Sequence, residues 1–244
     1  MAAAEQLYDK LQRPYDYIRK STIAAIEREN VREAVASFIA KARILELACG
    51  SGFYTYKLLE WGASSVLGVD ISSVMIDEAR HLEGGLFDIV FGAWLLNYAP
   101  DRTELIKMFR TIAMNLKGGG RFVGVTIVPS SNPLESLIAE AKIRPMPMGS
   151  GYIIHQYIKD VEDGIYINVH GDTPIGDLDF KCYHLKQEIH EEAAREAGLK
   201  GKFEWGVTKV PDGYLKEGVL GGASLAELET YRTLPHFGVL VIVK

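Results

Sequence analysis

Two glycines and two carboxylates in the first third of the chain have the residue types and spacing of a nucleoside-binding site. Glu46 lies in a short apolar run, Gly50 and Gly52 follow it as a Gly-x-Gly turn, and Asp70 comes 18 residues after Gly52. Glycines let a ligand approach the backbone, and an Asp at the end of the next strand can accept hydrogen bonds from both ribose hydroxyls. Glu46 can orient the loop or meet a cationic amino-acid group. A tight turn without a ligand is the alternative reading, and Asp70 argues against it.

The elements that must position these residues alternate between strand and helix. Short apolar runs predict strands over 44–48, 65–69, 87–91 and 122–128. Apolar residues at helical spacing predict helices over 21–39, 54–59, 72–80 and 105–116, the last of them stopped by the glycines at 118–120. This alternation predicts an α/β, Rossmann-like, doubly wound and mostly parallel sheet with helices on both faces.

The second half of the chain predicts a cap and the end of the same domain. Prolines interrupt residues 129–150, and patches of alternating polarity over 152–185 predict antiparallel strands laid over the sheet. A helix over 188–198 and strands over 203–208 and 237–243 follow, the last strand being antiparallel. We expect one domain over 1–244 with four parts: an N-terminal lid at 1–40, a core at 41–128, a cap at 129–186 and a C-terminal part at 187–244.

Composition excludes several other classes of function. The formal net charge is −5 and no stretch is dense in Lys or Arg, so neither nucleic acid nor an anionic membrane is expected as a partner. Residues 1–10 lack the apolar core of a signal peptide, and the longest strongly apolar run, 239–243, is too short to cross a bilayer. These observations predict a cytoplasmic protein. Cys49 and Cys182 are expected to be reduced thiols, and no metal is expected.

The glycine turn also distinguishes between cofactors. A dinucleotide fingerprint places a third glycine where this chain has Thr55, which disfavours NAD, although an NAD-linked oxidoreductase remains a weaker alternative. The segment Glu46-Leu-Ala-Cys-Gly-Ser-Gly52 resembles the first motif of class I S-adenosylmethionine-dependent methyltransferases. Further resemblances lie at residues 66–72, 87–90 and 116–122, so that the match covers about 40–128. Residues 95–100 look most like the small-molecule N-methyltransferase group that includes the toxoflavin-biosynthesis enzyme.

The resemblance implies S-adenosylmethionine as cofactor and assigns a role to individual residues. Asp70 would bind the ribose hydroxyls, Gly50 and Gly52 would pass beneath the methionine portion, and the backbone of Ala93 would face its amine. The other residues that the resemblance places around the cofactor are Tyr8, Tyr15, Glu46, Ala48, Ile71 and Met75. Ile71 and Met75 would pack on adenine. Tyr8 and Tyr15 resemble lid residues. The equal alternative is that these two aromatic residues only anchor a helix.

One departure from the family concerns the third strand of its sheet. Only residues 81–86 separate the predicted helix from the strand that starts at Phe87, whereas the family places a whole strand and loop there. Either this sequence omits a stretch of the chain, or the protein lacks that strand together with its adenine-reading carboxylate, which would leave an exposed edge.

Substrate-side residues are predicted less directly. The resemblance places Asn97 and Tyr98 at the carboxyl end of the sheet, and His155, His170, His184 and His236 are candidate bases by residue type. Methyl transfer relies mostly on positioning, so a base is optional. A small apolar or aromatic acceptor is suggested by the residues expected near the site, Trp94, Met146, Met148, Tyr152, Tyr157 and Tyr183. Two rivals stay open: a cofactor-binding protein without methyl transfer, and an enzyme that uses the sulfonium only as a fixed charge.

Overall fold

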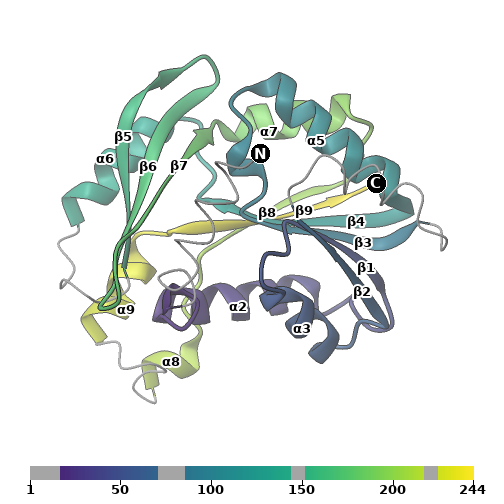
Figure 1. Ribbon diagram of the computed structural model, residues 1–244, viewed down its shortest axis with the longest axis horizontal. Coiled ribbons are helices and arrows are strands. Elements are labelled where there is room, and N and C mark those ends of the chain that lie inside the picture. The colour runs from purple at the N-terminus through teal and green to yellow at the C-terminus, as the bar shows by residue number, and fades with distance from the viewer. Residues whose placement is uncertain (1–16, 71–85, 144–151, 217–224) are drawn as a thin grey trace.

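The computed structural model describes residues 17–70, 86–143, 152–216 and 225–244. Within them a central sheet with helices on both faces adjoins a second, antiparallel sheet (Figure 1).

The central sheet has six described strands in the order β2-β1-β3-β4-β9-β8 (Figure 1). Their bounds are β1 Arg43–Leu47, β2 Ser65–Val69, β3 Phe87–Ala93, β4 Leu116–Ile127, β8 Phe203–Val207 and β9 Phe237–Val243. Strands β1 to β4 are parallel, whereas β9 runs antiparallel to β4 and β8 antiparallel to β9. The carboxyl ends of the four parallel strands therefore meet at one edge, where doubly wound sheets bind ligands. The predicted fold class is confirmed.

Helices cover both faces of this sheet (Figure 1). Two lie on one face, α2 Thr22–Val35 and α3 Phe53–Glu60, and two on the other, α5 Arg102–Asn115 and α7 Gln187–Glu196. Ile26 of α2 and Tyr54 of α3 belong to the core on the first face, and Phe109 of α5 and Ala193 of α7 to the core on the second. Burial of these apolar stripes holds the helices against the strands, at about 25 cal/mol per Å² of apolar surface removed from water.

The second sheet and one helix form the cap. The bounds of these elements are α6 Pro133–Ile143, β5 Tyr152–Val161, β6 Gly164–Asp172 and β7 Leu178–Leu185. The three strands pair antiparallel, as predicted for this region, and their order is β5-β6-β7. Leu137 of α6, Ile167 of β6 and Cys182 of β7 are buried with Ile127, the last residue of β4, so the cap packs on the end of the central sheet.

The junction between α5 and β4 differs from the prediction. We expected the helix to reach residue 116 and the glycines at 118–120 to stop it, but α5 ends at Asn115 and β4 begins at Leu116. The glycines lie inside the strand, where pairing with β3 shifts register between Phe87 and Ile89. Gly119 has φ +75°, a left-handed value that side chains disfavour, and this lets the strand bulge without ending.

The described residues also form three short helical elements. The short elements are the 3-10 helix η1 Leu96–Tyr98 and the helices α8 Asp212–Lys216 and α9 Leu225–Thr233, which the sequence pattern did not predict. Among the described residues β2 is the outermost strand on its side of the sheet, and the segment 81–86, where the family places a further strand, lies outside the described residues except for Leu86. The helix predicted over 72–80 lies outside the described residues.

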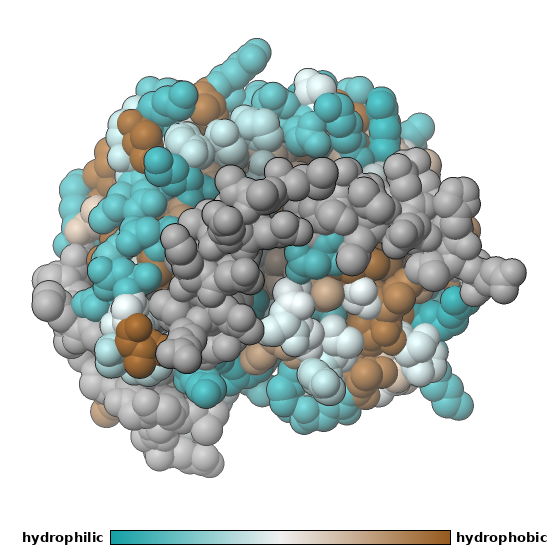
Figure 2. All heavy atoms as spheres, viewed as in Figure 1, coloured by the Kyte–Doolittle hydropathy of each residue, from teal (hydrophilic) through white to brown (hydrophobic). Residues whose placement is uncertain are grey.

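Hydrophilic and hydrophobic residues are interspersed over the described part of the face shown in Figure 2. No helix in the described ranges is both long and apolar enough to cross a membrane.

Candidate functional site

The glycine loop follows β1 and turns the chain into α3. Its backbone is left-handed at three positions, Ala48 (φ +57°), Gly50 (φ +50°) and Gly52 (φ +80°), and Gly52 forms the N-cap of α3. Glycine adopts such values at little cost, whereas an alanine at positive φ stores strain of order 1–3 kcal/mol. Strained backbone of this kind gathers at functional sites, which makes the loop that starts at Ala48 a candidate site.

Asp70 follows β2 and is bonded directly to this loop. The backbone N–H of Gly50 donates to Oδ2 of Asp70 at 2.6 Å, and the N–H of Cys49 donates to the carbonyl of Val69 at 3.1 Å. Because β1 and β2 are parallel with Leu47 opposite Val69, both segments leave the sheet at the same point. A carboxylate has about four acceptor sites, so its bond to the loop is compatible with binding a diol as well.

Glu46, one residue before the end of β1, is a buried carboxyl group. Its residue is 3% exposed, and its Oε2 accepts a 2.5 Å hydrogen bond from Oγ1 of Thr55. Burial raises the pKa of Glu46 to about 7, while the Thr55 bond and the Arg19 charge lower it and the Asp70 charge raises it. The group is therefore near its midpoint at neutral pH, and a cation placed beside it would favour its ionised form.

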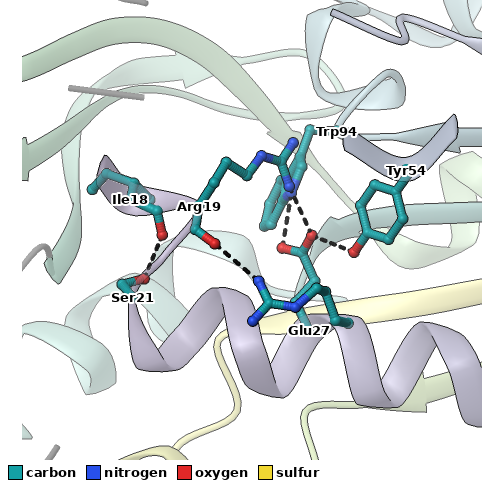
Figure 3. Close-up of polar contacts among 7 residues, drawn as sticks. Ile18, Arg19, Ser21, Glu27, Tyr54 and Trp94 are labelled. Carbon is teal, nitrogen blue, oxygen red and sulfur yellow. Dashed lines mark hydrogen bonds and ion pairs between the residues drawn. The ribbon is translucent and has the colours of Figure 1, made fainter. Parts of the chain in front are cut away.

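A second buried carboxylate, that of Glu27, joins α2 to α3 and to the segment that follows β3 (Figure 3). Glu27 of α2 accepts hydrogen bonds from Tyr54 of α3 at 2.7 Å and from Nε1 of Trp94 at 3.0 Å. Arg19 lies 3.2 Å from the same carboxylate and within 4.8 Å of the Phe53 ring centre. The charge of Arg19 also lowers the pKa of Glu46, so this cation acts on both buried carboxyl groups.

The end of β3 supplies the neighbouring wall of the site. Ala93 ends the strand, and Trp94 after it has φ +60°, a second strained position at this edge, with its N–H donating to the carbonyl of Val125 at 2.8 Å. Asn97 is buried and donates a long, 3.4 Å hydrogen bond to the carbonyl of Tyr183 in the cap. Its Oδ1 is buried without a hydrogen-bond partner among the described residues, and Tyr98 beside it is half-buried.

The structure brings together most of the described residues that the sequence singled out. Five of them lie at the carboxyl ends of β1 and β2, namely Glu46, Ala48, Gly50, Gly52 and Asp70. Ala93 ends β3, the strand that pairs with β1. The predicted residues Tyr8, Tyr15, Ile71, Met75, Met146 and Met148 lie outside the described residues.

The candidate histidines lie in the cap and its borders. His155 is buried against Glu140 and stacks on His236, and His184 is buried with its Nε2 donating to the carbonyl of Val128 at 3.0 Å. His170 pairs with Asp179 at 3.1 Å on the cap surface. Among the aromatics expected near an acceptor, Tyr157 is 44% exposed, so it does not line a buried pocket.

Sequence reasoning missed four residues that build the site, Arg19, Glu27, Tyr54 and Thr55. Thr55 had a signal, since it stands where a dinucleotide site requires glycine, and its hydroxyl is what holds Glu46. Glu27 had a weaker signal as an acid on the buried face of an otherwise apolar helix stripe. Arg19 had none, because its partners are close only after α2 packs against α3.

Comparisons with known proteins agree with this geometry. A protein-family model for a methyltransferase domain matches residues 44–86, which include the glycine loop and Asp70. The chain is 26% identical over 197 residues to a malonyl-[acyl-carrier protein] O-methyltransferase of Legionella pneumophila, covering 68% of this chain and 67% of that protein. It is 28% identical over 149 residues to an 18S rRNA (guanine(1575)-N(7))-methyltransferase of Saccharomyces cerevisiae, about half of each chain at 51% and 52%.

Solved structures with little sequence identity share the fold. A protein of Listeria monocytogenes assigned as an S-adenosylmethionine-dependent methyltransferase aligns with a TM-score of 0.56 and 15% identity over 91% of this chain and 98% of that one. The magnesium protoporphyrin IX methyltransferase of Synechocystis, solved with bound S-adenosylhomocysteine, aligns with a TM-score of 0.54 and 14% identity over 98% and 96%.

The chain is therefore similar to methyltransferases in two respects: the segment matched by the methyltransferase-domain model contains the glycine loop bonded to Asp70, and solved methyltransferases share the Rossmann-like fold.

Proposed function

We propose that this protein transfers the methyl group of S-adenosylmethionine to a small, apolar or aromatic metabolite of secondary metabolism in the cytoplasm, in the manner of the toxoflavin-biosynthesis-like N-methyltransferases. One observation carries the proposal. The 2.6 Å bond between Gly50 and Asp70 holds a glycine loop and a strand-end carboxylate together at the carboxyl edge of a parallel sheet.

The residues of this edge fit the parts of the cofactor. Asp70 accepts hydrogen bonds from the ribose hydroxyls, and the loop from Ala48 to Gly52 leaves its backbone open to the methionine portion. Glu46 and the Ala93 carbonyl offer negative charge to the methionine amine, and Arg19 offers positive charge to its carboxylate. Ile71, Met75, Tyr8 and Tyr15 lie outside the described residues, and for them the proposal keeps the roles that the family resemblance implies.

The protein's part in the reaction is to position and to exclude water. When bound, S-adenosylmethionine supplies an electrophilic methyl group on a sulfonium. The loop, Asp70 and Glu46 fix the orientation of that methyl group, while Asn97 and Tyr98 hold the acceptor in line with it, with the reacting atoms about 3–3.5 Å apart. The Oδ1 atom of Asn97 is buried and has no hydrogen-bond partner among the described residues. It is therefore suited to accept a hydrogen bond from an N–H or O–H group of the methyl acceptor.

An acceptor screen tests the proposal. Wild-type protein and Asp70→Ala are incubated with S-adenosylmethionine and panels of aromatic amines, phenols and heterocycles, and S-adenosylhomocysteine is quantified. A carrier-protein-bound carboxylic acid and rRNA are included because the two relatives named above act on such acceptors. The net charge of −5 argues against the RNA arm.

The screen, run beside binding measurements for S-adenosylmethionine and a nicotinamide cofactor, separates the proposal from its rivals. Acceptor-dependent turnover by wild type that Asp70→Ala loses supports the proposal. Cofactor binding without turnover on any panel supports a binding protein or a fixed-charge role. Binding of a nicotinamide cofactor in place of S-adenosylmethionine supports an oxidoreductase.

A further inference from the structure

Three ligand-type side chains meet where the cap adjoins the central sheet. Glu140 comes from α6, His155 from β5, and His236 directly precedes β9. The Nδ1 atom of His155 lies 3.1 Å from Oε2 of Glu140, and the Nδ1 atom of His236 lies 3.7 Å from Oε1. One carboxylate thus faces two imidazoles, whose rings are nearly parallel, at 12°, with centres 5.0 Å apart.

This cluster is buried, which sets it apart from an ordinary surface ion pair. The side chains of His155, His236 and Glu140 are 4%, 2% and 13% exposed. Buried His and carboxylate groups are paired with one another or bind a cation, and here a cation would replace the hydrogen bond that joins His155 to Glu140. The cap and the sheet each contribute ligands, so a cation here would join them.

The spacing of the donor atoms fits a tetrahedral cation. One donor atom from each residue can be chosen so that all lie within 4.8 Å of one another. Ligands about 2.0–2.1 Å from a tetrahedral zinc are roughly 3.4 Å apart, and each imidazole has a Glu140 oxygen near that distance, Oε2 at 3.1 Å from His155 and Oε1 at 3.7 Å from His236. Octahedral cations such as Mg²⁺ prefer all-oxygen ligands, whereas two imidazoles with one carboxylate suit Zn²⁺.

We propose that Glu140, His155 and His236 form a Zn²⁺ site whose fourth coordination position is open. Zinc sites with three protein ligands hold water or a substrate atom in the fourth position.

The placement of this site points to the acceptor. His236 precedes Phe237, which pairs with Ile127 at the carboxyl end of β4, so the cluster stands at the same sheet edge as the glycine loop. Strands β1 and β9 are three positions apart in the sheet, about 14 Å at about 4.8 Å per strand. On the proposed function, a methyl acceptor that reaches both sites would span about that distance and place an oxygen or nitrogen donor at the open position.

Metal binding is measured directly, without cofactor or turnover, so that its result is independent of the proposed methyl transfer. Chelator-treated wild type is titrated with Zn²⁺ by calorimetry and, separately, with Co²⁺ followed by visible absorption. Glu140→Gln, His155→Ala and His236→Ala remove one ligand each. His170→Ala is the matched control, because His170 makes the same kind of 3.1 Å pair, with Asp179, on the exposed surface of the cap.

Wild type and His170→Ala are expected to bind about one Zn²⁺ with micromolar affinity or better, to give the intense visible bands of four-coordinate Co²⁺, and to unfold at a higher temperature with Zn²⁺. Each ligand variant is expected to lose more than about tenfold in affinity. Absence of stoichiometric Zn²⁺ binding by folded wild type would overturn the proposal, as would equal loss in His170→Ala. The wild-type Co²⁺ spectrum decides the question even where a ligand variant does not fold.

Discussion

If Glu46 faces the cofactor as proposed, its buried carboxyl should make cofactor affinity depend on pH. Its pKa is raised to about 7 by burial, and the proposed methionine amine beside it is a cation that binds best to the ionised form. The ionised fraction rises with pH, so affinity should rise with pH. A substitution to Gln keeps the shape and the Thr55 contact while removing the titration.

The size of this effect follows from the pKa. With a pKa of about 7, Glu46 is about 9% ionised at pH 6 and about 76% ionised at pH 7.5. If only the ionised form binds tightly, the dissociation constant should fall about eightfold over this range, equal to about 1.3 kcal/mol. The range stops below pH 8 because the amine of the ligand itself begins to titrate there.

Isothermal titration with S-adenosylmethionine at pH 6, 6.5, 7 and 7.5 measures the slope. Wild type should show the eightfold gain, and Glu46→Gln should bind weakly and with little pH dependence. Glu60→Gln is the control, since Glu60 is an exposed carboxylate of α3 whose pKa is lowered by Lys57. The reasoning is refuted if Glu46→Gln keeps the wild-type slope, or if wild type shows none.

Three further outcomes are expected. Tyr54→Phe removes a donor from the buried Glu27 and should cost about 1–3 kcal/mol in the free energy of unfolding, measured by urea denaturation; a change below 0.5 kcal/mol would contradict the network. The apo protein should lose stability as pH rises from about 4.5 to 7, by up to about 3 kcal/mol, because the folded state holds the Glu46 proton more tightly than the unfolded state; Glu46→Gln should flatten that decline in the same assay. With a thiol reagent, native protein should expose Cys49 and protect Cys182, whose pKa burial raises to about 12, and bound S-adenosylmethionine should slow the reaction of Cys49; equal labelling of both thiols would contradict this.

The parallel core could be predicted because local pattern and tertiary role coincide there. The strands at 65–69 and 87–91 are short apolar runs, and the loop glycines sit where positive φ is needed. The fold and the placement of Gly50 beside Asp70 follow from those signals together. The prediction from the glycines at 118–120 was wrong, because glycine, which often ends a helix, also permits a bulge within a strand.

The rest of the site depends on contacts between distant segments. Arg19 and Glu27 reach Tyr54 and Trp94 only after α2 packs on the sheet, and no spacing in the sequence encodes those pairs. The proposed zinc ligands were missed for the same reason. Glu140 and His155 are 15 residues apart and His236 is 81 residues further on, which is not the short spacing of a metal motif.

The central claim is that the loop at Gly50 and the carboxylate of Asp70 bind the cofactor, and calorimetric titration with S-adenosylhomocysteine tests it most directly. Wild type should bind with micromolar affinity, and Asp70→Ala should weaken binding by about 1–3 kcal/mol, or roughly 5- to 150-fold. Absence of binding by folded wild-type protein, or equal affinity in the variant, would contradict the claim.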